Sequence, residues 1–165
     1  MNFVHDDGGR AAAGFKGKTS DCVVRAIAIA TGLPYREVYT NISFAASLER
    51  RKKGRSSPRT GVHKATTRRF LEAMGWLWTP TMQIGSGCKV HLADGELPTG
   101  RLIVSVSRHL VAVIDGVIHD TGDPQREEHV CEPDHGQDLK PGEWRNVNGI
   151  WHISRRCVYG YWSKA

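Results

Sequence analysis

The sequence has 165 residues, a length that suits one domain with its own hydrophobic core. Its hydrophobic fraction of 39% and charged fraction of 24% are ordinary for a globular protein, so the composition excludes a wholly disordered chain. The first ten residues carry His5, Asp6 and Asp7 in place of a signal peptide's apolar stretch, and no later apolar run reaches the roughly 18 residues of a membrane span. We therefore expect a soluble, cytoplasmic single domain over residues 1–165 with no membrane partner.

The net charge of +6 arises from one segment of the chain. Residues 50–69, which begin with Arg50 and end with Arg69, contain nine Lys and Arg and no Asp or Glu, leaving 14 basic residues against 17 acidic ones elsewhere. A solvated helix end followed by a loop is the simplest interpretation of this segment. The alternative is a surface that contacts nucleic acid or an acidic protein partner. No tryptophan lies within the segment, so the aromatic and basic pattern typical of single-strand binding is missing.

Four glycines in residues 1–18 predict an irregular N-terminal segment. The next three residues, Thr-Ser-Asp, are N-cap types, and they precede a short helix predicted over residues 22–31 that ends at Gly32. Apolar residues lie on nearly every side of this helix, which favours a buried, central position. A second helix is predicted over residues 34–53 and a third over 62–74.

After Pro80 the sequence changes to short β-branched runs separated by Gly, Asp and Pro. These runs predict antiparallel strands, at residues 101–107, 109–114, 117–121 and 157–162. Residues 122–149 are polar and rich in turn formers, which predicts an exposed loop. Helices followed by strands, without alternating βαβ units, indicate an α+β domain in which N-terminal helices pack on a C-terminal antiparallel sheet.

The four cysteines, Cys22, Cys88, Cys131 and Cys157, are widely spaced, which favours reduced thiols over a disulfide framework. Cys22 is the first residue of the first predicted helix. Unpaired amides and the helix dipole at this position lower the pKa of a thiol, and the thiolate is the reactive form. The same amides are placed to bind an oxyanion beside the sulfur. A buried structural cysteine is the alternative interpretation.

The dipeptide Asp115-Gly116 stands between two β-branched runs and predicts a two-residue hairpin turn. With this turn Val111 lies opposite Asp120, and Asp120 becomes the diagonal neighbour of His109 on the same face of the sheet.

His119 falls on the opposite face, and Asp115 belongs to the turn. We therefore expect Asp120 to orient His109, and His109 to lie beside Cys22 as its base. An ordinary surface histidine is the alternative for His109.

The helix-borne cysteine in SDCVVRAIAIATG, and the histidine and aspartate on the two strands of RHLVAVIDGVIHDT, resemble papain-like cysteine peptidases. The sequence most resembles the small papain-like proteins encoded by phages and prophages, also in GWLWTPTMQIGSGCKVHL. The resemblance implies a compact papain-like fold with a catalytic triad of Cys22, His109 and Asp120. It further implies a thiol hydrolase acting on a peptide or protein substrate without a cofactor, located in the host cytoplasm if a phage encodes it.

The sequence departs from papain in three places around this triad. Lys16 stands where papain has the glutamine that donates to the oxyanion, which leaves that donor unassigned. Asp120 replaces an asparagine, and it can fix the histidine tautomer equally well. Asp21 would disfavour a thiolate if it pointed inward, so we expect it to cap the helix amides instead.

These observations favour a cysteine-dependent hydrolase of the peptidase, isopeptidase or amidase type. Two alternatives remain open: a non-catalytic papain-like binding protein that uses residues 50–69, and a transglutaminase-like acyl transferase. Two sets of Cys and His residues have spacing that is poor for zinc, so no metal site is expected; they are Cys88 with His91, and His129, Cys131 and His135.

Overall fold

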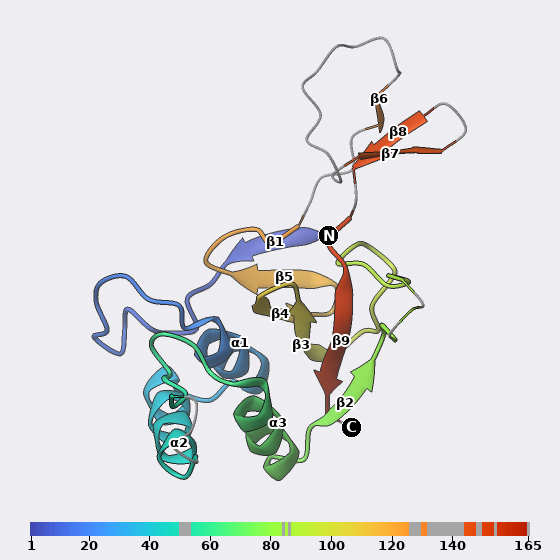
Figure 1. Cartoon of the computed structure of the whole chain (residues 1–165). Coiled ribbons are helices and arrows are strands. Elements are labelled where there is room, and N and C mark those ends of the chain that lie inside the picture. The colour runs from blue at the N-terminus through green and yellow to red at the C-terminus, as the bar shows by residue number, and fades with distance from the viewer. Residues whose placement is uncertain are drawn as a thin grey trace.

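The computed structural model of the chain describes residues 1–49, 54–83, 85, 87–125, 130–131, 144–147, 150–153 and 155–164. Within these residues the protein is α+β, with three helices that precede all but one of the strands (Figure 1). The helices are α1 (Cys22–Thr31), α2 (Tyr35–Ser47) and α3 (Lys64–Ala73). The strands are β1 (Asn2–His5), β2 (Leu77–Pro80), β3 (Arg101–Val106), β4 (His109–Ile114), β5 (Val117–Asp120), β6 (Val130–Cys131), β7 (Trp144–Val147), β8 (Ile150–Ile153) and β9 (Val158–Ser163).

The larger sheet has six strands in the order β1-β5-β4-β3-β9-β2. Strand β1 runs parallel to β5, whereas the other neighbours are antiparallel. The prediction of a purely antiparallel sheet is therefore wrong at one edge, and residues 2–5 form a strand rather than irregular chain. A parallel pair needs a long crossover, and here the connection between β1 and β5 contains α1, α2 and α3.

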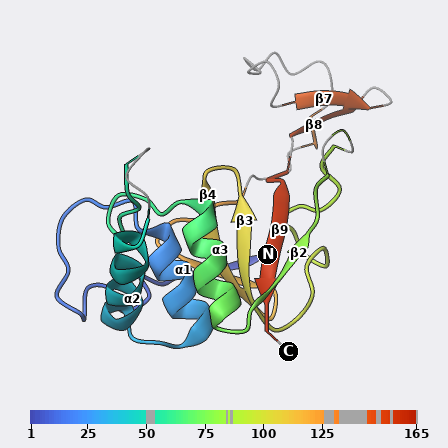
Figure 2. The same ribbon diagram turned by 60° about the horizontal axis from the view of Figure 1, so that its bottom comes forward.

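The helices cover one face of this sheet, as the two views together show (Figure 2). Helix α1 lies between the sheet and α2, and its residues from Val23 to Ala30 are all buried. The predicted bounds of this helix and its central position are confirmed. Such burial explains why apolar residues occur on all its sides, since it contacts strands on one side and a helix on the other.

The opposite face of the sheet has a second hydrophobic core. Val104, Val111 and Val113 lie there with Leu92, which comes from the long connection between β2 and β3. Phe3 of β1 packs against the same core. The sheet is thus covered on both faces, and its central strands β3 and β4 are almost wholly buried apolar segments, as strands covered on both sides should be.

The second helix ends at Ser47, whereas the prediction placed its end at residue 53. Residues 50–53 of the predicted helix lie outside the described part of the chain. Glu49 explains this end, because its carboxylate accepts hydrogen bonds from the Ser56 backbone and from the Ser56 and Thr66 hydroxyls. The chain therefore turns at Glu49 to reach the loop that follows. This residue's pKa is lowered to about 2, because these hydrogen bonds outweigh the opposing effect of burial.

The predicted loop over residues 122–149 is wrong in part. Strands β6, β7 and β8 form a second, three-stranded antiparallel sheet in the order β6-β8-β7, which lies apart from the larger sheet in both views. The remainder of the predicted loop, at residues 126–129, 132–143 and 148–149, lies outside the described residues, as do His129 and His135 of the zinc alternative.

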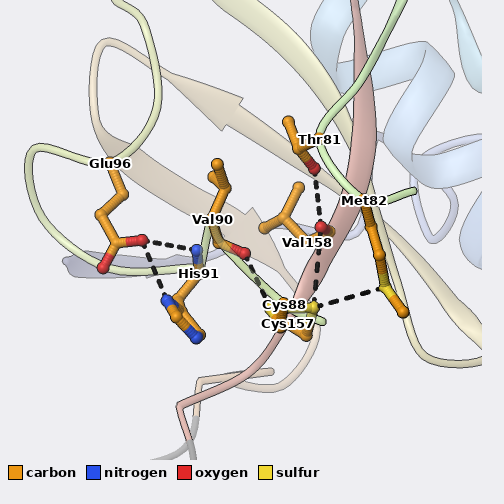
Figure 3. The surroundings of a disulfide bond; sticks show 8 residues. All are labelled: Thr81, Met82, Cys88, Val90, His91, Glu96, Cys157 and Val158. Atoms are coloured by element: carbon orange, nitrogen blue, oxygen red, sulfur yellow. Dashed lines mark hydrogen bonds and ion pairs between the residues drawn. A yellow bond between two sulfur atoms is a disulfide. The ribbon is translucent and has the colours of Figure 1, made fainter. Parts of the chain in front are cut away.

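Cys88 and Cys157 form a disulfide, which corrects the expectation of reduced thiols at these two positions (Figure 3). The disulfide joins the connection after β2 to the start of β9, across 69 positions in the sequence. The Thr81 hydroxyl strengthens this junction, because it donates to the Val158 carbonyl at 2.7 Å. Cys88 is consequently not available as a metal ligand beside His91, whose ring instead meets Glu96 at 3.0 Å.

Candidate active site

Cys22 is the first residue of α1, and its thiol is free and half-buried. The first intrahelical hydrogen bond of α1 joins the Arg25 amide to the Asp21 carbonyl, so the amides of residues 22–24 have no acceptor within the helix. The Asp21 side chain does not cap them, which contradicts the expected role of this carboxylate. The helix N-terminus therefore remains open to negative charge on the sulfur or on a bound substrate.

His109 opens β4, and Asp120 ends the neighbouring strand β5. The two strands meet at a tight turn in which Asp115 and Gly116 have φ values of 48° and 79°, as a type I′ hairpin turn requires. The predicted register is confirmed, since Ile114 pairs with Val117 and the pairing continues from there without a shift.

The Nε2 atom of His109 is hydrogen-bonded to Oδ2 of Asp120. The Cys22 thiol is the other partner of the His109 ring, close enough that each group shifts the pKa of the other. The three predicted site residues therefore form a continuous chain from thiol to imidazole to carboxylate. His119 is excluded from it, since its ring faces Asp6 at 3.3 Å.

The ionisation of these groups favours a charged pair. Burial raises the pKa of the Cys22 thiol, but the hydrogen bonds from His109 and from the Leu110 amide outweigh it, so the net pKa is lowered. Burial likewise opposes the charged form of His109, yet its bonds to Asp120 and Cys22 raise its pKa to about 9. The pKa of Asp120 is lowered despite its burial, chiefly by the hydrogen bond to His109. The two shifts have the same consequence, since each favours the thiolate and imidazolium pair over the neutral thiol and imidazole.

Arg25, which sequence reasoning missed, connects this site to a second buried carboxylate. Its Nη2 lies 3.3 Å from Oδ1 of Asp120, and its Nη1 bonds Oδ1 of Asp21. The other oxygen of Asp21 receives the Tyr35 hydroxyl at 2.5 Å and lies 3.2 Å from Nε of Arg10. Asp21 is 1% exposed, so its charge is compensated by these partners instead of by the helix amides.

One signal in the sequence could have indicated this arrangement. Arg25 is the charged residue of an otherwise apolar helix, and a buried charge implies charged partners. The identity of those partners could not follow from local pattern, because Tyr35 and Asp120 are distant in sequence. Both contacts depend on how α2 and β5 lie against α1.

The backbone before Cys22 is held by the loop between α2 and α3. The Arg59 carbonyl accepts the Thr19 hydroxyl at 2.9 Å and the Ser20 amide at 2.8 Å. The Arg59 guanidinium in turn donates to the carbonyls of Lys16 and Lys18. The Lys16 side chain is exposed and its carbonyl faces Arg59 and Arg10, so the side-chain donor for an oxyanion stays unassigned. This loop contains part of the predicted basic segment 50–69.

A cavity of about 250 Å³ lies between α1, α3 and the sheet. Val23 and Leu110, which directly follow Cys22 and His109 in sequence, both line it. Its other lining residues come from α3 and the chain just before it, and from strands β2, β3 and β9. They are Val62, Lys64, Thr67, Arg68, Trp78, Ser105, Tyr159 and Trp162.

Among the residues that the structure describes, no group of three His, Cys, Asp or Glu side chains is placed to hold a metal ion. None of the helices in this same part of the chain is both long enough and apolar enough to cross a membrane. In comparisons with protein-family models, with curated proteins and with solved structures, nothing matches this chain.

Proposed function

We propose that this chain is a papain-like cysteine hydrolase that cleaves an amide, isopeptide or related acyl bond. The observation that carries the proposal is the placement of His109 between Cys22 and Asp120: its ring is hydrogen-bonded to Asp120, the thiol pKa is lowered and the imidazole pKa is raised. A buried structural cysteine would show the opposite sign, because burial alone raises the pKa of a thiol.

The arrangement of elements supports the same proposal. A central helix carries the cysteine at its N-terminus, while a sheet packed on that helix supplies the histidine and the carboxylate. This is the order and context of the papain-like peptidases that the sequence resembles, among them the small proteins of phages and prophages. The shared context is an argument from chemistry and position, since a fold alone does not establish an activity.

In the proposed reaction the Cys22 thiolate attacks the acyl carbon and the carbonyl oxygen becomes an oxyanion. The free amides at the start of α1 stabilise that charge. Collapse of the intermediate breaks the carbon–nitrogen bond, and the His109 imidazolium gives its proton to the leaving amine. The neutral His109 then takes a proton from water, whose oxygen attacks the thioester and releases the acid and the thiolate. Asp120 keeps the ring oriented throughout.

Alkylation by iodoacetamide, located on Cys22 by mass spectrometry and followed against pH, tests this proposal. Because the thiolate is stabilised, we expect reaction well below the ordinary cysteine pKa of about 8.5. His109→Ala removes the positive partner and leaves the effect of burial, so its profile should move to higher pH. His119→Ala is the matched control and should leave the profile unchanged, since that ring faces Asp6.

The rate of hydrolysis should depend on pH through His109 as well as through the thiol. The His109 pKa of about 9 means that the proton needed by the leaving group is present below that pH and is lost as the pH rises through it. Hydrolysis should therefore decline near pH 9, while alkylation persists. A wild-type alkylation rate that rises only above about pH 8.5 and ignores His109→Ala would refute the enzyme.

A further inference from the structure

The lining of the cavity includes the residue that follows each member of the proposed catalytic pair, Cys22 and His109. The Leu110 amide lies close enough to the Cys22 sulfur to lower its pKa, and Leu110 also lines the cavity. Val23, the next residue after Cys22, lines it from α1. A substrate whose scissile carbonyl lies at the sulfur would therefore place a neighbouring group in this cavity.

The walls of the cavity suit a single bulky apolar group. The rings of Trp78 and Trp162 lie 5.1 Å apart between centroids and form one wall, and Val23, Val62 and Leu110 add aliphatic surface. At about 250 Å³ the cavity is smaller than typical sites for drug-sized ligands, yet it has room for one large side chain.

The charged groups that line the cavity or border the thiol are predominantly basic. Lys64 and Arg68 line the cavity, and Arg68 is paired with Glu72 at 2.8 Å. The two segments around Cys22, residues 16–20 and 54–72, contain seven Lys or Arg residues and Glu72 as their one acidic residue. These basic residues are Lys16, Lys18, Arg55, Arg59, Lys64, Arg68 and Arg69.

Backbone contacts hold two of these cations to the chain segment that leads into Cys22. Arg59 binds this segment through its carbonyl and its guanidinium, and Lys18 belongs to it. The nearby carboxylates of Asp21 and Asp120 are buried and bound to Arg25, so they do not offset this charge at the surface.

We propose that the substrate is an acidic polypeptide segment in which a bulky apolar residue, seated in this cavity, is flanked by Asp or Glu. This inference rests on the proposed function for the position of the scissile bond, and it adds the class of substrate. A peptide fits better than a nucleic acid, because the cavity adjoins a nucleophile whose chemistry needs an acyl carbon.

Binding to the full-length Cys22→Ala variant tests recognition without cleavage. Three fluorescently labelled peptides are compared: one with a Phe between Asp and Glu residues, one with Gly in place of that Phe, and one with Asn and Gln in place of the acids. The first peptide should bind about tenfold more tightly than either of the others. Added salt should weaken only the part of its affinity that comes from the Asp and Glu residues.

Two pairs of variants locate the binding. Lys64→Glu should remove the preference for acidic peptides, whereas Lys89→Glu, at an exposed position on the connection over the opposite face of the sheet, should not. Trp78→Leu should remove the preference for Phe, whereas Leu77→Ala, at an exposed neighbouring position, should not. Lys64 is exposed, so its substitution keeps the test decisive even if Trp78→Leu proves unstable.

Equal binding of the three peptides would overturn the inference. It would also be overturned if a single-stranded DNA oligonucleotide bound more tightly than the first peptide and Lys64→Glu abolished that binding. Cleavage by the wild-type protein separates this result from the proposed function. Selective binding without any cleavage would leave recognition intact and refute the hydrolase. Equal cleavage of all three peptides would support the hydrolase and refute the recognition.

Discussion

At the scale of single residues, Arg25 links the candidate active site to the protein interior. It lies one helical turn after Cys22 and holds Asp120 from the side opposite His109, while its other amino group holds Asp21. A planar guanidinium can serve two carboxylates at once, whereas a lysine ammonium cannot reach both in the same geometry. Arg25 thus acts as a positioning residue through Asp120.

This role predicts a defined phenotype for Arg25→Lys. The variant should lose about 1–3 kcal/mol of unfolding free energy, because one buried carboxylate loses one of its charged partners. The alkylation profile of Cys22 should also move to higher pH, since Asp120 holds His109 less firmly and His109 then stabilises the thiolate less. Urea unfolding and pH-dependent alkylation measure the two effects.

Arg101→Lys is the matched control, because Arg101 donates to the carbonyls of Ala30 and Ile29 at the other end of α1. It should lose stability without a change in the alkylation profile. A purely structural Arg25 would behave like Arg101 in both measurements, and that result would remove its positioning role.

The contact between His109 and Asp120 could be predicted from sequence, because a two-residue turn fixes the register of its own hairpin. The partners of the Asp21 side chain could not be predicted in this way. Its partners Arg10, Arg25 and Tyr35 come from three different parts of the chain, and a cap was the expected local arrangement. Local rules thus indicated the hairpin half of the site, and tertiary contacts decided the helix half.

At the scale of elements, the edge strand β2 forms one wall of the cavity and depends on a glycine in β9. A Cβ atom at Gly160 would lie 2.4 Å from Trp78 Cζ2 and 2.7 Å from the Thr79 carbonyl oxygen. The Trp78 ring therefore lies directly against the backbone of β9. The carbonyl belongs to the paired strand, so this contact cannot be relieved by a side-chain rotation alone.

Gly160→Ala should consequently displace Trp78 and the strand that carries it. We expect a loss of about 1–3 kcal/mol in unfolding free energy, together with a change in tryptophan fluorescence. Gly116→Ala, in the hairpin turn, offers a contrast, because nothing lies near its Cβ and its cost should come from a φ of 79° alone. An unchanged fluorescence spectrum and stability in Gly160→Ala would contradict this account of the wall.

The long elements were predictable and the short edge strands were not. Helix α1 and strand β4 have the predicted bounds, because strong apolar patterns and turn residues delimit them. Strands β1 and β2 have four residues each, too few for a clear alternation, and each pairs with a strand far along the chain. Sequence reasoning also placed the end of α2 too late, because it could not foresee that Glu49 binds Ser56 and Thr66.

At the scale of the whole molecule, the disulfide and the candidate active site lie in different parts of the fold, so we expect the disulfide to affect stability and not the reactivity of Cys22. Cys88 and Cys157 join the connection that covers one face of the sheet to strand β9, whereas Cys22 lies at the helix-covered face. Wide spacing of cysteines in sequence suggested free thiols, yet this pair became adjacent only because β9 returns to the sheet beside β2 and β3. No local pattern contains that information.

Reduction of this disulfide should therefore lower stability and leave the thiolate site unchanged. Because the bond closes a segment spanning 69 positions, its loss should cost about 2–4 kcal/mol of unfolding free energy. Urea unfolding of the Cys22→Ser variant, with and without dithiothreitol, measures this cost in a protein that lacks the reactive thiol. The double variant Cys22→Ser, Cys157→Ser should lose the same stability without a reductant. Folded wild-type and Cys157→Ser proteins should share one pH profile of Cys22 alkylation, since the hydrogen bonds of His109 do not involve β9. A profile that moved to higher pH in Cys157→Ser would show instead that the disulfide side of the sheet helps to hold the site.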